Sequence, residues 1–169
     1  RTSSRSMTQT PKNIAIIGSG LVGSLLAIYL RKQGHTITVF DRRPDIRTIK
    51  FSGRSINLAM SNRGWKALRK VGLEDAIQEI AIPMDKRAMH VVDQPMYFQN
   101  YGKDGESIWS RSRGILKRKM IDLAERAGAT VKFDEKVWDI DLPEATICTG
   151  AAEKSKWKEY KYDMVFGCD

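Results

Sequence analysis

The fold of this chain is decided by residues 13–41, which read NIAIIGSGLVGSLLAIYLRKQGHTITVFD. An apolar run at residues 14–17 suits a strand that is buried on both faces, and a glycine-rich turn follows it. Apolar side chains then recur at helical spacing over residues 25–30, before two cations and a glycine that end the helix. A second strand is expected at residues 36–40. Strand, helix and strand in about 30 residues predict a βαβ unit with parallel strands.

Three glycines, Gly18, Gly20 and Gly23, lie in the turn at the spacing of a dinucleotide-binding motif. The first allows a tight turn, the second leaves room for a pyrophosphate, and the third lets the helix pack closely on the strand. Unpaired N–H groups at the helix start favour a phosphate there. Asp41 ends the second strand, where a carboxylate accepts from a ribose hydroxyl. The pattern predicts a dinucleotide site and leaves open whether the ligand is FAD or NAD(P).

Two interpretations are open for Arg42 and Arg43, which follow that acid. Contact with a 2′-phosphate would favour NADP, whereas exposure to solvent needs no ligand. The charge pattern alone favours exposure.

The composition is that of a globular protein with a basic balance. The 169 residues include 29 Lys and Arg against 20 Asp and Glu, and 41% are hydrophobic. Basic residues are interspersed with acids and accompany no nucleic-acid-binding motif, so no nucleic-acid partner is expected. No apolar stretch approaches the ~20 residues that span a bilayer. Two cysteines and two histidines predict neither a disulfide framework nor a metal site, and indicate a reducing, cytoplasmic setting.

Further motifs resemble one family. The segments GRSINLA (53–59), FDRRPD (40–45) and IPMDKRAMH (82–90) are similar in order and spacing to those of the kynurenine 3-monooxygenase family, which are FAD-dependent aromatic hydroxylases. The resemblance runs from Asn13 to Asp169 and corresponds to the N-terminal third of such an enzyme. It implies an α/β, doubly wound Rossmann-like fold with the start of a mixed β-sheet substrate region.

The polar, run-free composition of the first residues and the same resemblance together imply domain bounds. Residues 1–12 are expected to be a disordered lead or an expression scar, and residues 13–169 an FAD-binding domain that breaks off at its C-terminus. Residues 84–110 would contribute to the substrate region. Membrane attachment is not encoded in this stretch, and a mitochondrial outer-membrane anchor, if any, would lie beyond residue 169.

The resemblance also implies site residues. Arg87 and Tyr101 match the pair that holds the substrate carboxylate, although a register shift of one residue would substitute Lys86 for Arg87. Asp41 stands where many relatives have Glu. The residues implied to bind FAD are Gly18, Gly20, Val22, Gly23, Phe40, Asp41, Arg42, Arg43, Ala59, Arg113 and Val137.

The implied activity is hydroxylation of L-kynurenine to 3-hydroxykynurenine, with FAD as cofactor, NADPH as reductant and O₂ as co-substrate. No acid–base catalytic residue is assigned, because the cofactor performs the difficult chemistry. The whole enzyme would catalyse this reaction, whereas this piece alone is expected to be inactive. Three alternatives stay open: another FAD-dependent aromatic hydroxylase, a non-catalytic dinucleotide-binding module, and a basic nucleic-acid binder, which only the net charge of +9 supports.

Overall fold

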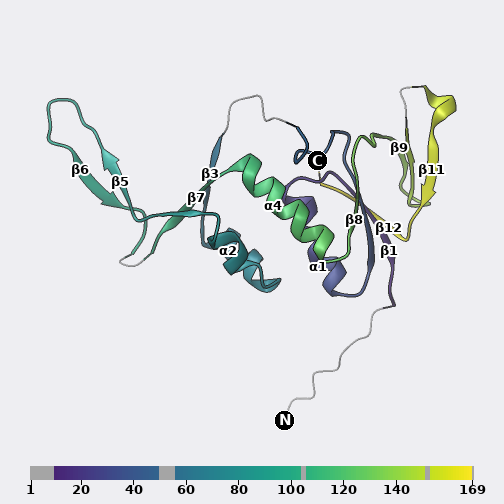
Figure 1. Cartoon of the computed structure of the whole chain (residues 1–169), viewed down its shortest axis with the longest axis horizontal. Coiled ribbons are helices and arrows are strands. Elements are labelled where there is room, and N and C mark those ends of the chain that lie inside the picture. Colours follow the sequence, from purple (N-terminus) through teal and green to yellow (C-terminus); the bar gives the residue numbers. More distant parts are fainter. Residues whose placement is uncertain (1–9, 50–55, 104–105, 151–152, 169) are drawn as a thin grey trace, which may run out of the picture. The chain divides into compact units, whose positions relative to one another are not determined.

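The computed structural model describes residues 10–49, 56–103, 106–150 and 153–168 (Figure 1). They divide into two compact units, one from the described residues within 1–50 and 120–169 and the other from those within 51–119. Most of the expected lead, residues 1–9, lies outside the described residues. So do Gly53, Arg54 and Ser55 of the GRSINLA segment, and Asp169.

Four parallel strands form the central sheet of the first unit, in the order β12, β1, β2, β8 (Figure 1). Helix α1, Leu21–Lys32, connects β1 to β2. The predicted βαβ unit is therefore confirmed. The strands are β1 (Asn13–Ile17), β2 (Thr36–Phe40), β8 (Thr130–Lys132) and β12 (Met164–Gly167).

The core of this unit lies on both faces of the central sheet. Ile14 and Ile16 of β1 are almost fully buried, and so is Ala15, whose side chain points to the opposite face. Ala15 packs with Phe40 and with Ile147 of a second sheet. Burial on both faces explains why β1 reads as a continuous apolar run instead of an alternating one.

The second sheet of this unit is antiparallel, in the order β11, β10, β9. Two of its strands are β9 (Val137–Asp141) and β10 (Thr146–Thr149). The Lys-rich segment that follows forms the short helix η1 (Lys154–Lys156) and strand β11 (Lys158–Lys161).

The other unit contains an antiparallel sheet in the order β3, β7, β4 and a separate β5–β6 hairpin. Trp65 and Leu68 of α2, with the following Val71, are buried, as their helical spacing predicts. Helix α4 (Arg113–Arg126) starts in this unit and ends in the first. The elements of this unit are β3 (Asn57–Met60), α2 (Asn62–Lys70), α3 (Glu74–Gln78), β4 (Ile82–Met84), β5 (Lys86–Met89), β6 (Tyr97–Asn100) and β7 (Ile108–Ser112).

None of the helices in the described ranges is both long enough and apolar enough to cross a membrane.

A single arginine ties the segment after β2 to α4. The Arg47 guanidinium lies 2.7 Å from a carboxylate oxygen of Asp45 and 2.8 Å from one of Asp122, and it also pairs with Glu125. The pKa of Arg47 is raised above its ordinary value, most strongly by the hydrogen bond that it donates to Asp45 and next by the one to Glu125. The cation also lies 5.6 Å from the ring centroid of Phe133. Arg47 therefore holds together three carboxylates that would otherwise repel one another.

We expect the substitution Arg47→Met to lower the free energy of unfolding by about 1–3 kcal/mol, because three carboxylates would then lie together without their cation. Urea denaturation measures this. Lys161→Met is the control, since Lys161 forms an exposed pair with Glu144 in the same unit and its loss should leave stability unchanged. Equal stability of the Arg47 variant and the wild type would show that the cluster contributes nothing.

Candidate functional site

Two of the three motif glycines are required by the backbone itself. Gly18 has a φ of 105°, in the left-handed region where side chains are strained, and its N–H donates to the Phe40 carbonyl at 2.7 Å. A Cβ added at Gly23 would lie 1.9 Å from the carbonyl oxygen of Gly18. Any side chain at Gly23 would therefore push α1 away from the turn.

Gly20 differs from the other two glycines. Its φ of −65° is ordinary, and a Cβ there would meet no described atom closer than the Cys168 carbonyl oxygen at 3.8 Å. Folding does not require a glycine at this position. The absent side chain instead leaves the backbone open at the start of α1, where no side chain in the described part caps the helix and no acid lies in its first turn. Such a helix start offers N–H groups to an anion.

Asp41 is buried directly beside this turn. Both the N–H of Ser19, at 3.2 Å, and its hydroxyl donate to Oδ2 of Asp41. The N–H of Arg43 donates to Oδ1 at 3.0 Å. The carboxylate is thus held by backbone and side-chain donors of the turn and of its own strand end.

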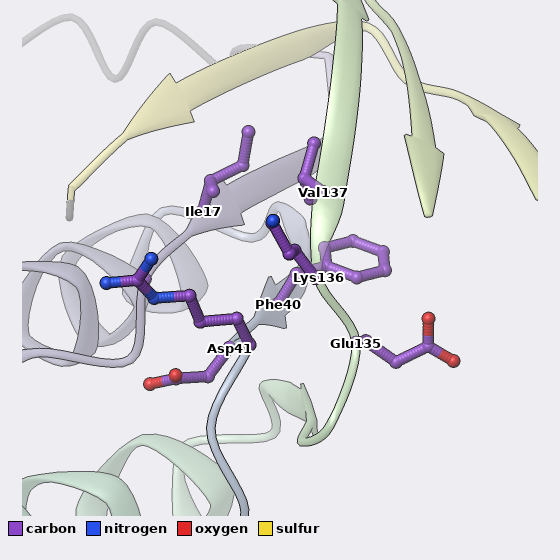
Figure 2. Close-up of a pocket in the computed structure, with 8 residues that line it drawn as sticks. Ile17, Phe40, Asp41, Glu135, Lys136 and Val137 are labelled. Carbon is purple, nitrogen blue, oxygen red and sulfur yellow. The ribbon is translucent and has the colours of Figure 1, made fainter. Parts of the chain in front are cut away.

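A pocket of about 110 Å³ opens at the carboxyl ends of β1 and β2 (Figure 2). In Figure 2, the carboxylates of Asp41 and Glu135 point to opposite sides, and both residues line the pocket. The volume is below the ~300 Å³ at which pockets start to hold a whole drug-sized ligand, so this pocket suits one part of a dinucleotide. Its lining residues are Ile17, Gly18, Phe40, Asp41, Arg42, Glu135, Lys136 and Val137.

The structure therefore brings together most of the predicted FAD residues of the first unit. Gly20, Val22 and Gly23 lie on the adjoining turn and helix, and Val22 is 67% exposed there. Arg43 lies next to the pocket, because its backbone N–H donates a hydrogen bond to Asp41. The residues that line the pocket as predicted are Gly18, Phe40, Asp41, Arg42 and Val137.

Sequence reasoning missed three lining residues: Ile17 at the end of β1, Glu135 and Lys136. The last two lie between β8 and β9, and the N–H of Glu135 donates to the Asp41 carbonyl at 3.0 Å. Oε2 of Glu135 is buried without a partner among the described residues. The ammonium of Lys136 lies 3.3 Å from the ring centroid of Trp138. Glu135 and Lys136 could have been found from their position directly before Val137. They follow β8, which belongs to the same parallel sheet as β2, so they lie at the same edge of that sheet.

Two further predicted FAD residues, Ala59 and Arg113, lie in the other unit. Ala59 is exposed on β3, opposite Ser110 of β7. Arg113 is the exposed first residue of α4, and its N–H donates to the Ile56 carbonyl at 3.1 Å.

The predicted substrate pair lies on one face of the β5–β6 hairpin. Arg87 is opposite Gln99, whose Oε1 accepts from Nε and Nη2 of Arg87 at 2.9 and 2.6 Å. The N–H of Tyr101 donates to the Asp85 carbonyl, which continues the ladder by one residue. Because faces alternate along a strand, Tyr101 shares the face of Gln99 and Arg87, whereas Lys86 lies on the opposite face.

Tyr101 also lines a pocket of about 290 Å³ within this unit. Arg87 is not among the residues that line this pocket. Its lining residues are Ser61, Asn62, Arg63, Tyr101, Gly102, Glu106, Ser107 and Ile108.

The parallel sheet, the glycine turn and the buried acid define a Rossmann-like dinucleotide-binding domain. A family model described as an NAD(P)-binding Rossmann-like domain matches residues 16–68. The chain is also similar to proteins named kynurenine 3-monooxygenase. It is 69% identical over 161 residues to that of Christiangramia forsetii and 67% identical to that of Flavobacterium johnsoniae, in each case over 95% of this chain. The protein of that name from Anopheles gambiae is 37% identical over all of this chain.

The resemblance to kynurenine 3-monooxygenases that the motifs indicate is therefore confirmed, for an N-terminal part of such proteins. The chain spans 36% of the length of the first two relatives and 35% of the third.

Solved structures confirm the predicted fold class. The p-nitrophenol 4-monooxygenase PnpA of Pseudomonas putida matches 95% of this chain and 41% of its own with a TM-score of 0.75. A 2-methyl-3-hydroxypyridine-5-carboxylic acid oxygenase matches 92% of this chain and 39% of its own with a TM-score of 0.72. Identities of 18% and 14% mean that these likenesses show the fold alone.

The variant Gly23→Ala is expected to destabilise the chain by more than about 2 kcal/mol, because its Cβ would collide with the Gly18 carbonyl. Thermal and urea unfolding measure this. Gly64→Ala is the matched control: it lies inside α2, where no other described segment comes within 4 Å of the added Cβ, and should stabilise by about 0.5–1 kcal/mol. A Gly23 variant as stable as the wild type would contradict the close contact.

Proposed function

We propose that this chain binds the adenosine and pyrophosphate part of FAD, within a monooxygenase that uses NADPH and O₂ to convert L-kynurenine to 3-hydroxykynurenine. One observation carries the proposal. The glycine turn and the buried Asp41 adjoin one pocket, in a chain that is 69% identical over 161 residues to a protein named kynurenine 3-monooxygenase.

The residues of the first unit suit the dinucleotide half of FAD. The open backbone at Gly20 and the uncapped start of α1 would receive the pyrophosphate. Asp41 would accept from a ribose hydroxyl, and the apolar Val137 would lie beside the adenine. The Asp41 carboxylate would repel the 2′-phosphate of NADP, which favours FAD over NADP at this turn.

In the other unit we assign Ala59 and Arg113 to further contacts with FAD, on the resemblance. A bound flavin would supply the redox chemistry, in which NADPH provides two electrons and O₂ provides one oxygen atom to the aromatic ring and the other to water. The chain's own residues bind and orient the reactants.

We assign Arg87 and Tyr101 to the carboxylate of L-kynurenine. A guanidinium binds a carboxylate through two parallel hydrogen bonds, and a tyrosine hydroxyl adds a third donor. Arg87 and Tyr101 share a face of the hairpin, which supports this assignment. Lys86 lies on the opposite face, which argues against the register shift that would substitute Lys86 for Arg87. Gln99 orients the guanidinium through its two hydrogen bonds.

Two measurements on the protein at its full natural length test the proposed function. The first is the absorption spectrum of the purified protein, which should show bound flavin. The second is NADPH oxidation, which L-kynurenine should stimulate. Flavin binding with preferential turnover of a benzoate that lacks the amino-acid side chain would favour another aromatic hydroxylase. Nucleotide binding without any stimulated oxidation would favour a non-catalytic module.

Gly20→Ala should leave folding intact and weaken FAD binding by roughly tenfold or more, because the added methyl group occupies the space beside the pyrophosphate. Titration of the chain with FAD, followed by flavin fluorescence, gives the affinity, and circular dichroism verifies the fold. Gly64→Ala serves as the control and should bind FAD as the wild type does. Unchanged affinity of the Gly20 variant would place the pyrophosphate elsewhere.

Arg87→Ala in the full-length protein should weaken L-kynurenine binding by about 2–4 kcal/mol, because the substrate carboxylate loses its charged partner. Lys86→Ala removes a cation from the other face of the same strand and should leave affinity unchanged. Substrate-dependent changes in the flavin spectrum report both. If the Lys86 variant is the weaker binder, the shifted register is correct.

A further inference from the structure

Ser19, between the first two motif glycines, has no part in the motif's known roles, yet it is completely buried. Its hydroxyl and its N–H both donate to the same oxygen, Oδ2 of Asp41. Its carbonyl oxygen accepts from the hydroxyl of Ser24, in the first turns of α1, at 3.2 Å. One residue thus connects the turn that would face the pyrophosphate, the start of the helix and the acid that would face the ribose.

These contacts fix the orientation of the Asp41 carboxylate. A carboxylate can rotate about its last torsion angle, and an unrestrained one would have to be ordered when a ligand binds. Here Oδ2 is held by Ser19 and Oδ1 by the N–H of Arg43, so each oxygen has a donor from a different part of the chain. Hydrogen bonds to a charged, buried acceptor are among the stronger ones in proteins. The carboxylate is therefore set in place before a ligand arrives.

We propose that Ser19 is a positioning residue for dinucleotide binding: it holds the Asp41 carboxylate in the orientation that accepts from the adenosine ribose. The proposal rests on the proposed function, namely that the glycine turn binds the adenosine half of FAD. It predicts that the hydroxyl of Ser19 contributes to affinity only through the ribose hydroxyls. A serine that served folding alone would affect every ligand of the turn to the same extent.

The test uses Ser19→Ala and three probes: FAD, ADP, and 2′,3′-dideoxy-ADP, which lacks both ribose hydroxyls. Affinity for FAD comes from flavin fluorescence, and affinities for the other two come from displacement of FAD. We expect the variant to bind FAD and ADP roughly five- to twentyfold more weakly than the wild type, since a charge-assisted bond that orients the acceptor is lost. Binding of 2′,3′-dideoxy-ADP should change by less than about twofold, because this probe has no ribose hydroxyl that could donate to the Asp41 carboxylate.

Thr149→Val is the matched control, because it removes another fully buried hydroxyl of the same unit that has no hydrogen-bond partner among the described residues. It should bind all three probes as the wild type does. A second measurement introduces Ser19→Ala into an Asp41→Asn background, where the serine substitution should add less than about twofold to the loss of FAD affinity.

Equal weakening of all three probes by Ser19→Ala, or no weakening of any, would overturn the proposal. A wild-type chain that binds neither FAD nor ADP would instead overturn the proposed function, so the two failures are distinguishable.

Discussion

The contact on which the first unit depends is the close approach of α1 to the turn that precedes it. The backbone at Gly23 lies so near the Gly18 carbonyl that a Cβ would be only 1.9 Å from that oxygen. This approach sets the start of α1 beside the end of β1, and the N–H of Gly18 then reaches the Phe40 carbonyl of β2. Asp41 follows directly and meets Ser19. The site is thus a consequence of helix packing, and among the three motif glycines Gly20 is the one that the described backbone does not require.

The sequence was sufficient to predict this part because its signals are local. Apolar runs, glycine spacing and a terminal acid all lie within residues 13–41, and the strands β1 and β2 occur where these patterns indicate. The short strands β3, β4 and β7 were not predicted, since their residues are only partly buried and show no clear alternation. Pairing with distant segments, as between Ala59 and Ser110, stabilises them. Such partners cannot be read from a local pattern.

The candidate site shows the same division. The glycines and Asp41 could be predicted from spacing alone, whereas Arg87 and Tyr101 required a family resemblance, because an arginine and a tyrosine on exposed strands carry no signal of their own. Neither the spacing nor the resemblance indicated which face of the hairpin each cation occupies. The hairpin register places Lys86 and Arg87 on opposite faces. The bond from Ser19 to Asp41 was equally unpredictable, since a serine inside a glycine motif fits many side-chain orientations.

Lys136 links the pocket to the neighbouring antiparallel sheet. Lys136 lines the pocket, and its ammonium lies 3.3 Å from the ring centroid of Trp138, which stacks on Trp157. A cation over an exposed indole gains about 0.5–1 kcal/mol. An anionic ligand that pairs with Lys136 must break the cation–π contact with Trp138 and lose its stabilisation. The Trp138 ring therefore competes with an anionic ligand for Lys136. A change at Trp138, which is not among the residues that line the pocket, would thus alter the strength of anion binding.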